Sequence, residues 1–340
     1  MKKISAAFFE LEQWEQEYLK TRLPRAIVPF FFNRALSQSA LKKIRACEIL
    51  SVFIYSEITE KIITNLPSLK LIHTCSTGFN HIDIHAARKR GIAVTHVPYY
   101  GENTVAEHSF ALLLSLARKT HLSYAKTIRA DFSIKSLRGF DLAQKTLGII
   151  GMGHIGLHSA RIARGFSMKV QAYDPYPNQL IAKKYAFCYV TLEKLLKTSD
   201  VIFLHCPLNE KTHHLINKQN IKLLKKGAVL INTSRGQVVD TEALIYALDH
   251  GILKAAGLDV LESECVIVDE KQILHHKIPQ GCDLKTVVEN HLLLQYDNVL
   301  ITPHNAFNTE EALTRILDTT IKTIASFICG RMINRVAIVP

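Results

Sequence analysis

Short hydrophobic runs alternate with longer segments of mixed polarity along most of the chain. In the first third, five runs rich in β-branched and aromatic residues have the length of buried strands: residues 4–9, 26–32, 49–54, 69–75 and 92–97. The segments between them, such as 57–65 and 82–89, have the character of helices. Alternation of this kind predicts parallel strands joined by crossover helices.

A second strand–helix series follows in the rest of the chain. Its expected strands are residues 146–150, 170–173, 201–205, 229–232, 255–260 and 299–302. A chain of 340 residues exceeds the size at which one core usually splits, so we expect two α/β units. Their boundaries are predicted near Glu102 and near Phe307.

Two capping boxes mark helix starts. A long helix is predicted with Thr104 as its N-cap and Glu107 three residues later. A helix of that length suits a connection between domains or a dimer contact. The second box, Asn308 and Glu311, is expected to open the last helix, and Gly330 suits the position just after that helix ends.

The composition is that of an ordinary globular protein, with 48% hydrophobic and 21% charged residues. No apolar run approaches the roughly 18–20 residues that span a bilayer, and the short apolar stretch after Lys3 ends at Glu10, so neither a membrane span nor a signal peptide is expected. Seven cysteines without a CxxC pair or a Cys/His cluster argue against a disulfide framework and against a metal site. A cytoplasmic location is expected.

The net charge of +12 raises the possibility of a nucleic-acid partner. The basic residues are scattered in short groups, however, with no basic tail and no interleaved aromatic series. We therefore expect no nucleic-acid binding, and interpret the charge as a solvated surface that also attracts anionic ligands.

Gly151, Gly153 and Gly156 form a GxGxxG motif between an apolar strand and a helix-like segment. The first glycine makes a tight turn, the second lets a pyrophosphate approach the backbone, and the third lets the helix pack close to the strand. The helix N-terminus supplies N–H groups and a partial positive charge for the phosphates. The motif therefore predicts a dinucleotide site.

Asp174 ends the next expected strand, 18 residues after Gly156. Its carboxylate would accept hydrogen bonds from the adenosine ribose and would repel a 2′-phosphate, so NAD is favoured over NADP. The alternative is a glycine-rich turn that holds no ligand, and the combination of strand, helix and acid weighs against it.

Three residues with complementary chemistry, Arg235, Glu264 and His304, follow expected strands of the second unit. Ligands of open α/β sheets lie beyond the carboxyl ends of the strands, so these side chains are expected to share one crevice. Arginine suits the bidentate binding of a carboxylate, and histidine suits proton transfer near pH 7. A glutamate beside the ring would keep the proton on it. The alternatives are a surface arginine, an ordinary acidic loop and a structural histidine among sixteen.

The chain resembles the D-isomer-specific 2-hydroxyacid dehydrogenases, and within them the D-lactate dehydrogenase branch. The likeness is clearest over residues 137–307, in LRGFDLAQKTLGIIGMGHIG, VIFLHCPLNEKT, LINTSRGQVVDTEAL, GLDVLESE and ITPHNAF. The first third is looser, with STGFNHID and VPYYGENTVAEH as the similar segments.

The resemblance implies a bilobed dehydrogenase. Residues 103–306 would form a Rossmann domain that binds NAD, and residues 1–102 with 307–340 a flavodoxin-like, substrate-binding lid domain. It also implies a homodimer with the helix near Thr104 at the interface. Arg235 would bind the carboxylate of a 2-keto acid, His304 would donate a proton as NADH delivers hydride, and Glu264 would hold His304 protonated.

Further positions carry over from the family's binding sites. Beside the three glycines, the expected cofactor contacts are His154, Ile155, Asp174, Cys206, Pro207, Thr212, Thr233, Ser234, Arg235 and Asp259, of which Asp259 matches the residue that holds the nicotinamide amide. The expected substrate contacts are Tyr55, Thr77, Gly78, Tyr100, Arg235 and Phe307. No metal ligand is among them.

Several functions remain open within this resemblance. Thr77 stands where phosphite-oxidising relatives carry lysine, and Glu264 where formate-oxidising relatives carry glutamine, so both activities are disfavoured. Pyruvate or a slightly larger keto acid is the first candidate substrate, with glyoxylate, hydroxypyruvate, a bulkier keto acid or an NAD-sensing co-repressor role as alternatives. The segment 265–298 is longer than the family's minimal form. It is interpreted either as a loop that sets specificity or as a passive insertion.

Overall fold

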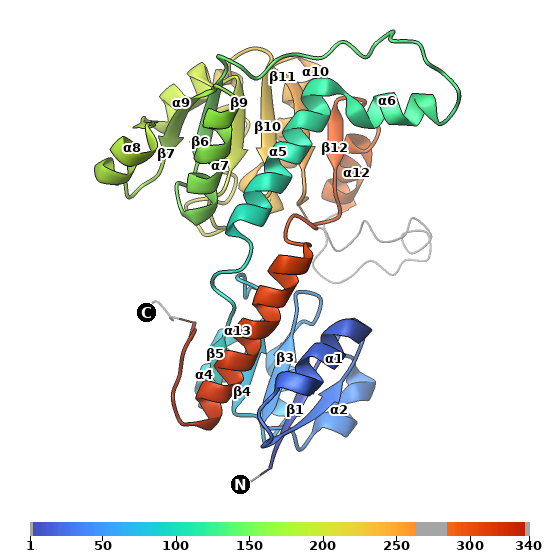
Figure 1. Ribbon diagram of the computed structural model, residues 1–340, viewed down its shortest axis with the longest axis vertical. Helices are drawn as coiled ribbons and strands as arrows, with labels where there is room; N and C mark the ends of the chain where they lie inside the picture. The colour runs from blue at the N-terminus through green and yellow to red at the C-terminus, as the bar shows by residue number, and fades with distance from the viewer. Residues whose placement is uncertain (1–2, 263–283, 337–340) are drawn as a thin grey trace. The chain divides into compact units, whose positions relative to one another are not determined.

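Each of two compact units is built on its own parallel sheet (Figure 1). The computed structural model describes residues 3–262 and 284–336. Unit 1 lies within Met1–Tyr100 and Thr309–Pro340, and unit 2 within Gly101–Asn308. The prediction of two parallel-sheet α/β units is confirmed.

Unit 1 contains a five-stranded sheet in the order β2-β1-β3-β4-β5. In chain order its elements are β1 (Ile4–Phe8), α1 (Gln13–Arg22), β2 (Ile27–Phe31), α2 (Gln38–Ile44), β3 (Ile49–Val52), α3 (Glu60–Thr64), β4 (Leu71–Thr74), α4 (Ile84–Lys89), β5 (Ala93–Thr95) and, after unit 2, α13 (Glu310–Ile328). The helix-like segments expected at 57–65 and 82–89 are therefore helical over Glu60–Thr64 and Ile84–Lys89.

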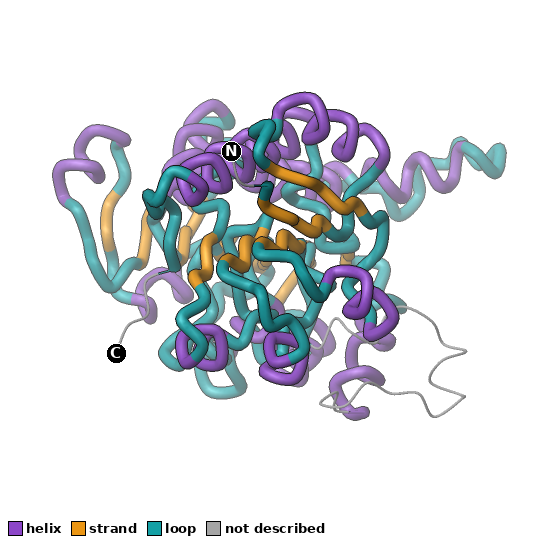
Figure 2. Tube along the Cα trace, turned by 90° about the horizontal axis from the view of Figure 1, so that it is seen from below, coloured by secondary structure: helices purple, strands orange, loops and turns teal. Residues whose placement is uncertain are grey.

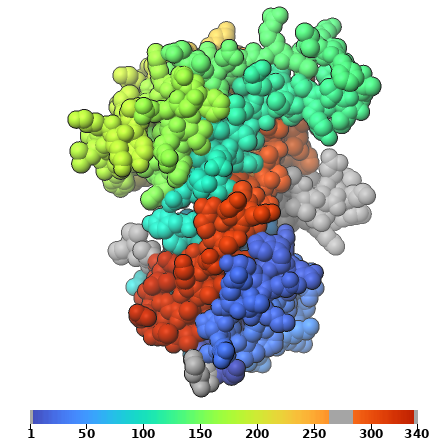
Figure 3. Space-filling model, viewed as in Figure 1, coloured from blue at the N-terminus to red at the C-terminus, as the bar shows by residue number. Residues whose placement is uncertain are grey.

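The two faces of this sheet bury alternate residues of each strand, as its pleat requires. On β1, Ala7 belongs to one core cluster together with residues of α2, α3 and α4. Its neighbours Ala6 and Phe8 belong to the opposite cluster, with residues of α1 and α13. In the space-filling view α13 (red) lies beside the N-terminal segment (blue) of the same unit (Figure 3). The last helix thus completes the core of the first sheet.

Unit 2 contains a seven-stranded sheet in the order β12-β11-β10-β9-β6-β7-β8. Its elements are α5 (Glu102–Arg118), α6 (Thr120–Thr127), β6 (Thr146–Ile150), α7 (His154–Gly165), β7 (Lys169–Tyr173), α8 (Gln179–Tyr185), β8 (Cys188–Tyr189), α9 (Leu192–Thr198), β9 (Val201–Leu204), η1 (Ile221–Leu223), β10 (Ala228–Asn232), η2 (Gly236–Val238), α10 (Thr241–Asp249), β11 (Leu253–Leu258), α12 (Leu284–Leu293) and β12 (Val299–Ile301). The short edge strand β8 was not expected from the sequence.

Helices cover both faces of this sheet. Val201 and Phe203 of β9 pack in a cluster with residues of α5 and α7. The alternate residues, Ile202 and Leu204, pack on the other face with residues of α9, α10 and α12. Buried strands of this kind explain why the hydrophobic runs were continuous and did not alternate with polar residues.

Both predicted N-caps are wrong. Gly101 precedes α5 and its carbonyl accepts the first helical hydrogen bond, so Thr104 lies inside the helix and is buried. Glycine caps a helix without any side-chain signal, which left the threonine as the visible candidate. Thr309 caps α13 in place of Asn308, because its hydroxyl accepts a backbone N–H of the first turn. Gly330 does follow α13 with φ of +73°, as predicted.

No helix in the described part of the chain is long and apolar enough to cross a membrane.

Candidate active site

The glycine-rich turn between β6 and α7 has the geometry that a phosphate group needs. Gly151 has φ of +94°, and a Cβ atom there would come within 2.7 Å of the backbone nitrogen of Cys206. A Cβ atom at Gly156 would overlap the carbonyl oxygen of Gly151, whereas nothing lies within 4 Å of such an atom at Gly153. The first and third glycines are thus required for packing. The second leaves open space before the N-terminus of α7, which fits a dinucleotide pyrophosphate.

Asp174 follows β7 and is tied to this turn. One carboxylate oxygen accepts the backbone N–H of Met152 at 2.8 Å, and the other accepts that of Tyr176 at 2.9 Å. The carboxylate is therefore held at the end of the strand next to the glycine turn. A ribose hydroxyl would meet it at this position in a bound dinucleotide.

Cys206 and the turn after it follow β9. Burial raises the pKa of the Cys206 thiol to about 11, so at neutral pH it is an uncharged wall residue. The Thr212 hydroxyl donates to the carbonyl oxygen of Pro207 at 2.6 Å and accepts the backbone N–H of Asn209 at 2.8 Å. Thr212 closes this turn upon itself.

Arg235 belongs to a turn shaped by the side chain of Asn232 at the end of β10. The amide oxygen of Asn232 accepts both the N–H and the hydroxyl of Ser234, at 3.0 and 2.8 Å, and its amide nitrogen donates to the carbonyl oxygen of Arg235 at 2.9 Å. The Thr233 hydroxyl lies 2.9 Å from that of Ser109 on α5. The turn is thereby fixed from two sides, with the Arg235 side chain partly exposed.

Gly236 adds a steric constraint to the same turn. A Cβ atom at this position would overlap the backbone of Leu261 and Glu262, just after β11. Only glycine allows this approach, so the turn that carries Arg235 lies directly against the chain that leaves the neighbouring strand.

Asp259 fastens the turn that carries His304. This carboxylate is 1% exposed; one oxygen accepts the Thr302 hydroxyl at 2.5 Å and the Asn305 N–H at 3.0 Å, and the other accepts the Ala306 N–H at 2.9 Å. His304 has φ of +51°, which is uncommon for a residue other than glycine. Asp259 therefore compensates for a strained turn that displays the imidazole.

Two further histidines belong to this neighbourhood and were missed from the sequence. Nε2 of His108, on α5, lies 3.1 Å from the hydroxyl of Thr302 and 3.4 Å from a carboxylate oxygen of Asp259. Nε2 of His205 lies 2.9 Å from the Ser159 hydroxyl, and burial lowers the pKa of that imidazole to about 3. The position of His205, immediately before Cys206 at a strand end, was the available signal.

The residues described above that follow strands of unit 2 lie at the same edge of its sheet. In a parallel sheet every strand ends at that edge, and the glycine turn, Asp174, Cys206, Arg235, Asp259 and His304 follow β6, β7, β9, β10, β11 and β12 respectively. Of the three residues expected to share a crevice, Arg235 and His304 therefore lie at this edge. Glu264 lies outside the described residues, so its distance from His304 is not part of this geometry.

The expected substrate contacts of unit 1 follow β3, β4 and β5 at the carboxyl edge of the other sheet. Tyr55 is 66% exposed, and the Thr77 hydroxyl donates to the carbonyl oxygen of Val97 at 2.9 Å. Gly78 accepts the Ser76 hydroxyl through its carbonyl oxygen at 2.6 Å. Tyr100 closes unit 1, whereas Phe307 belongs to unit 2.

Comparison with known proteins gives one family. Residues 110–306 match the family model of the D-isomer specific 2-hydroxyacid dehydrogenase NAD binding domain. The chain is 34% identical to a 2-hydroxyacid dehydrogenase homolog of Haemophilus influenzae, over 98% of this chain and 99% of the other. It is also 34% identical to D-lactate dehydrogenase of Escherichia coli K12, over 95% and 96% of the two chains.

A solved structure agrees with these relatives. D-lactate dehydrogenase from Aquifex aeolicus, in complex with NAD and lactic acid, superposes with a TM-score of 0.82 at 37% identity, over 96% of each chain. With the glycine turn and Asp174 at the expected strand ends, the chain belongs to the D-isomer specific 2-hydroxyacid dehydrogenase family, as an NAD-dependent enzyme of the D-lactate dehydrogenase type.

Proposed function

We propose that the enzyme interconverts a small 2-keto acid and its D-2-hydroxy acid, with pyruvate and D-lactate as the first candidate pair. The support is the edge formed by three adjacent strands, β10, β11 and β12. Arg235, Asp259 and His304 follow them, and Asp259 fixes the turn that carries His304. Neighbouring strand ends of this kind would allow a substrate acid bound by Arg235 to lie beside the proton donor His304.

Each residue has a separate role in the proposed reaction. The Arg235 guanidinium binds the substrate carboxylate through a pair of N–H groups and polarises the keto oxygen. The His304 imidazole gives its proton to that oxygen, and takes it back in the reverse direction. Glu264 holds the ring in its protonated form. Bound NADH supplies the hydride that the keto carbon receives.

The cofactor would lie along the carboxyl edge of the unit 2 sheet. The glycine turn holds the pyrophosphate and Asp174 the adenosine ribose, which selects against NADP. At the nicotinamide end, Cys206 offers an uncharged wall and Asp259 a carboxylate already fixed by its own hydrogen bonds. The other proposed contacts are His154, Ile155, Pro207, Thr212, Thr233 and Ser234.

Unit 1 is proposed to be the substrate-binding domain. Tyr55, Thr77, Gly78 and Tyr100 follow its central and edge strands at one edge of the sheet. The phenol groups of the two tyrosines and the hydroxyl of Thr77 can form hydrogen bonds with a small polar acid. Gly78, which has no side chain, leaves its backbone accessible to the same molecule. Phe307, which belongs to unit 2, is proposed as a further, apolar substrate contact.

A homodimer is proposed through the segment that begins with α5. After α5, residues 119–138 extend away from the rest of unit 2 in both views (Figures 1 and 2). We call this segment the arm. Four of its large hydrophobic side chains are 64–86% exposed: Tyr124, Ile128, Phe132 and Ile134. An exposed apolar group of this size is typical of a protein–protein contact.

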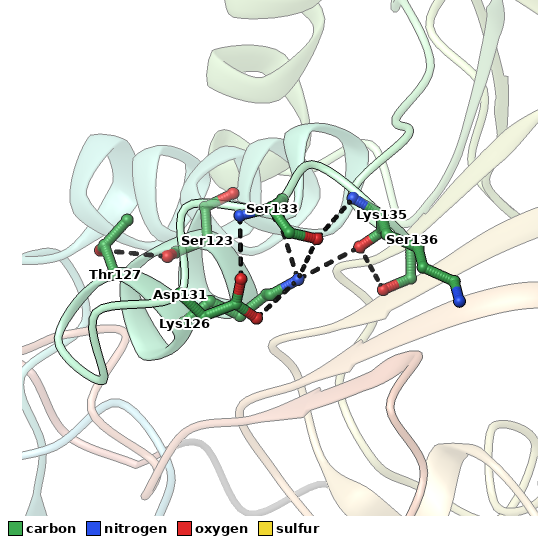
Figure 4. Close-up of polar contacts among 7 residues, drawn as sticks. All are labelled: Ser123, Lys126, Thr127, Asp131, Ser133, Lys135 and Ser136. Carbon is green, nitrogen blue, oxygen red and sulfur yellow. Dashed lines mark hydrogen bonds and ion pairs between the residues drawn. The ribbon is translucent and has the colours of Figure 1, made fainter.

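The arm is held in shape by its own polar contacts (Figure 4). The ammonium of Lys126 donates to the carbonyl oxygen of Ser133 at 2.9 Å and pairs with the Asp131 carboxylate at 3.1 Å. Asp131 also accepts the backbone N–H of Ser133 at 2.9 Å. A preformed arm loses little conformational entropy when a second copy covers its apolar side chains.

A cytoplasmic location is proposed as well. The five described cysteines, Cys47, Cys75, Cys188, Cys206 and Cys329, are free thiols. A reducing compartment keeps thiols in this state.

The proposed reaction is tested by NADH oxidation with a panel of pyruvate, glyoxylate, hydroxypyruvate and phenylpyruvate. We expect turnover with at least one of them, and Arg235→Ala should lose most keto-acid affinity while NADH fluorescence still reports binding. Arg161→Ala, which removes an exposed arginine of α7, is the matched control. Unchanged keto-acid affinity in Arg235→Ala would refute the role of that residue, and full activity in a folded His304→Ala variant would refute the proton donor.

A further inference from the structure

Two histidines and a glutamate converge in unit 2, apart from the residues of the proposed reaction. His213 and His214 lie in the connection after β9, and Glu262 follows β11, 48 residues after His214. One ligand atom of each residue lies within 4.8 Å of those of the other two. Nε2 of His214 is 2.7 Å from a carboxylate oxygen of Glu262, and the two imidazoles stack with their centroids 4.0 Å apart.

The backbone that carries the two imidazoles is held in place. The N–H of His214 donates to the carbonyl oxygen of Gln237 at 2.8 Å, and Ile216 forms a parallel bridge with Val239. The Asn217 amide donates to the carbonyl oxygen of His214 at 3.1 Å. The turn that carries the two histidines is therefore attached to the segment just after Arg235. Its backbone would lose little conformational entropy when an ion binds.

Glu262 is oriented by neighbours of its own. Its second carboxylate oxygen accepts the Thr241 hydroxyl at 2.8 Å, which directs the first oxygen toward His214. The Asn290 amide on α12 donates to the Glu262 carbonyl oxygen at 2.6 Å. The Glu262 side chain is 16% exposed. Hydrogen bonds of this kind around a ligating carboxylate strengthen metal sites in general.

The donor set selects a class of ion. Two imidazole nitrogens and one carboxylate oxygen suit Zn²⁺ and neighbouring first-row ions, whereas Mg²⁺ and Ca²⁺ prefer oxygen ligands alone. We propose that His213, His214 and Glu262 form a Zn²⁺-binding site. Three protein ligands leave a fourth position for water, and the exposed His213 gives the ion access from solvent.

This site lies next to the proposed catalytic residues without including them. The backbone of Glu262 packs against Gly236, the residue after Arg235, yet Arg235 and His304 are not ligands. A bound ion would join the connection after β9 to the chain that leaves β11, and would stabilise the native state by mass action. Metal binding at His213, His214 and Glu262 can therefore be measured independently of the substrate that the enzyme uses.

The test is a Zn²⁺ titration of the metal-free, full-length protein in competition with a chromophoric chelator. We expect one tight site, weakened at least about tenfold by the double variant His213→Ala/His214→Ala and by Glu262→Gln. The matched control is His275→Ala/His276→Ala. It removes the other pair of adjacent histidines in the sequence and should leave the affinity for Zn²⁺ unchanged. Zn²⁺ should also raise the melting temperature of the wild type and of this control alone.

Three results would overturn the inference: no stoichiometric Zn²⁺ binding, equal affinity in the wild type and in His213→Ala/His214→Ala, or loss of the ion in the His275→Ala/His276→Ala control. Circular dichroism establishes that each variant is folded. Glu262→Gln preserves the size of the side chain, so it decides the question if the double histidine variant does not fold.

Discussion

Acidification should destabilise unit 1 through one buried histidine. His73, on β4, is fully buried, and its two ring nitrogens lie 3.0 Å from the hydroxyls of Thr95 on β5 and Thr320 on α13. Burial, with a smaller effect from His96, lowers the pKa of the imidazole from 6.5 to about 3. His73 therefore stays neutral in the folded protein at every pH at which the enzyme would normally be handled.

The size of the effect follows from linkage. The folded-state pKa lies below the unfolded value, so the stability tied to the neutral ring is complete above pH 6.5 and is lost as the pH falls from 6.5 toward 3. At pH 5, about 1.5 units below the unfolded value, His73 should cost unit 1 about 2 kcal/mol of its free energy of unfolding.

The single tryptophan provides the assay. Trp14 lies on α1 of unit 1, so its emission during urea unfolding reports the unfolding of this unit. The effect of pH on the stability of unit 2 through His205 is therefore not part of the signal. Wild type and His73→Gln are compared at pH 7.5 and pH 5, with His85→Gln, an exposed histidine of α4, as the control. We expect the pH-dependent loss to shrink by about 2 kcal/mol in His73→Gln alone. An equal loss in wild type and His73→Gln would refute the reasoning.

Three further predictions concern the cofactor, the active-site turn and the arm. Asp174→Ala should narrow the preference for NADH over NADPH by about tenfold, measured as the ratio of the two kcat/KM values; an unaltered ratio would show that selectivity lies elsewhere. Gly236→Ala should lower kcat/KM for the keto acid by about 100-fold, because displacing the Arg235 turn by about 1 Å has that effect, while the Kd for NADH changes little. Gly165→Ala, where a Cβ atom has no neighbour within 4 Å, is its control and should retain activity. Replacing both Phe132 and Ile134 with aspartate should raise the dimer dissociation constant, measured by sedimentation equilibrium, at least about 100-fold. The reason is that burial of each apolar side chain in the interface would contribute about 1.5–3 kcal/mol to the free energy of association. An unchanged dissociation constant would locate the interface elsewhere.

The hydrophobic pattern predicted most of the strands because the inner strands of both sheets are buried on both faces. The continuous run that ends at Leu204 is an example, since its alternate residues enter two different cores. Helix ends were harder to predict. A capping box is recognised from side chains, whereas the N-cap of α5 is Gly101, which has none. At α13, Asn308 and Thr309 are adjacent and both can act as an N-cap, and the structure has Thr309 in that position.

The candidate site was predictable to the extent that strand ends determine it. Arg235 and His304 follow strands of one sheet, as their sequence positions indicated. The sequence did not reveal that Asp259 supports the His304 turn, because three hydrogen bonds from residues more than 40 positions away create that role. The meeting of His214 with Glu262 was invisible for the same reason: a pair separated by 48 residues has no local pattern.

The division of unit 1 into two stretches of chain has a consequence for biosynthesis. The strands of its sheet leave the ribosome first, but α13, which covers one face of that sheet, follows only after all of unit 2. Contacts such as that between His73 and Thr320, 247 residues apart, cannot form until then. Ala6, Phe8 and Leu71 therefore stay uncovered by that helix while unit 2 is being made, and this interval is when a nascent chain is most exposed to aggregation or to chaperone binding.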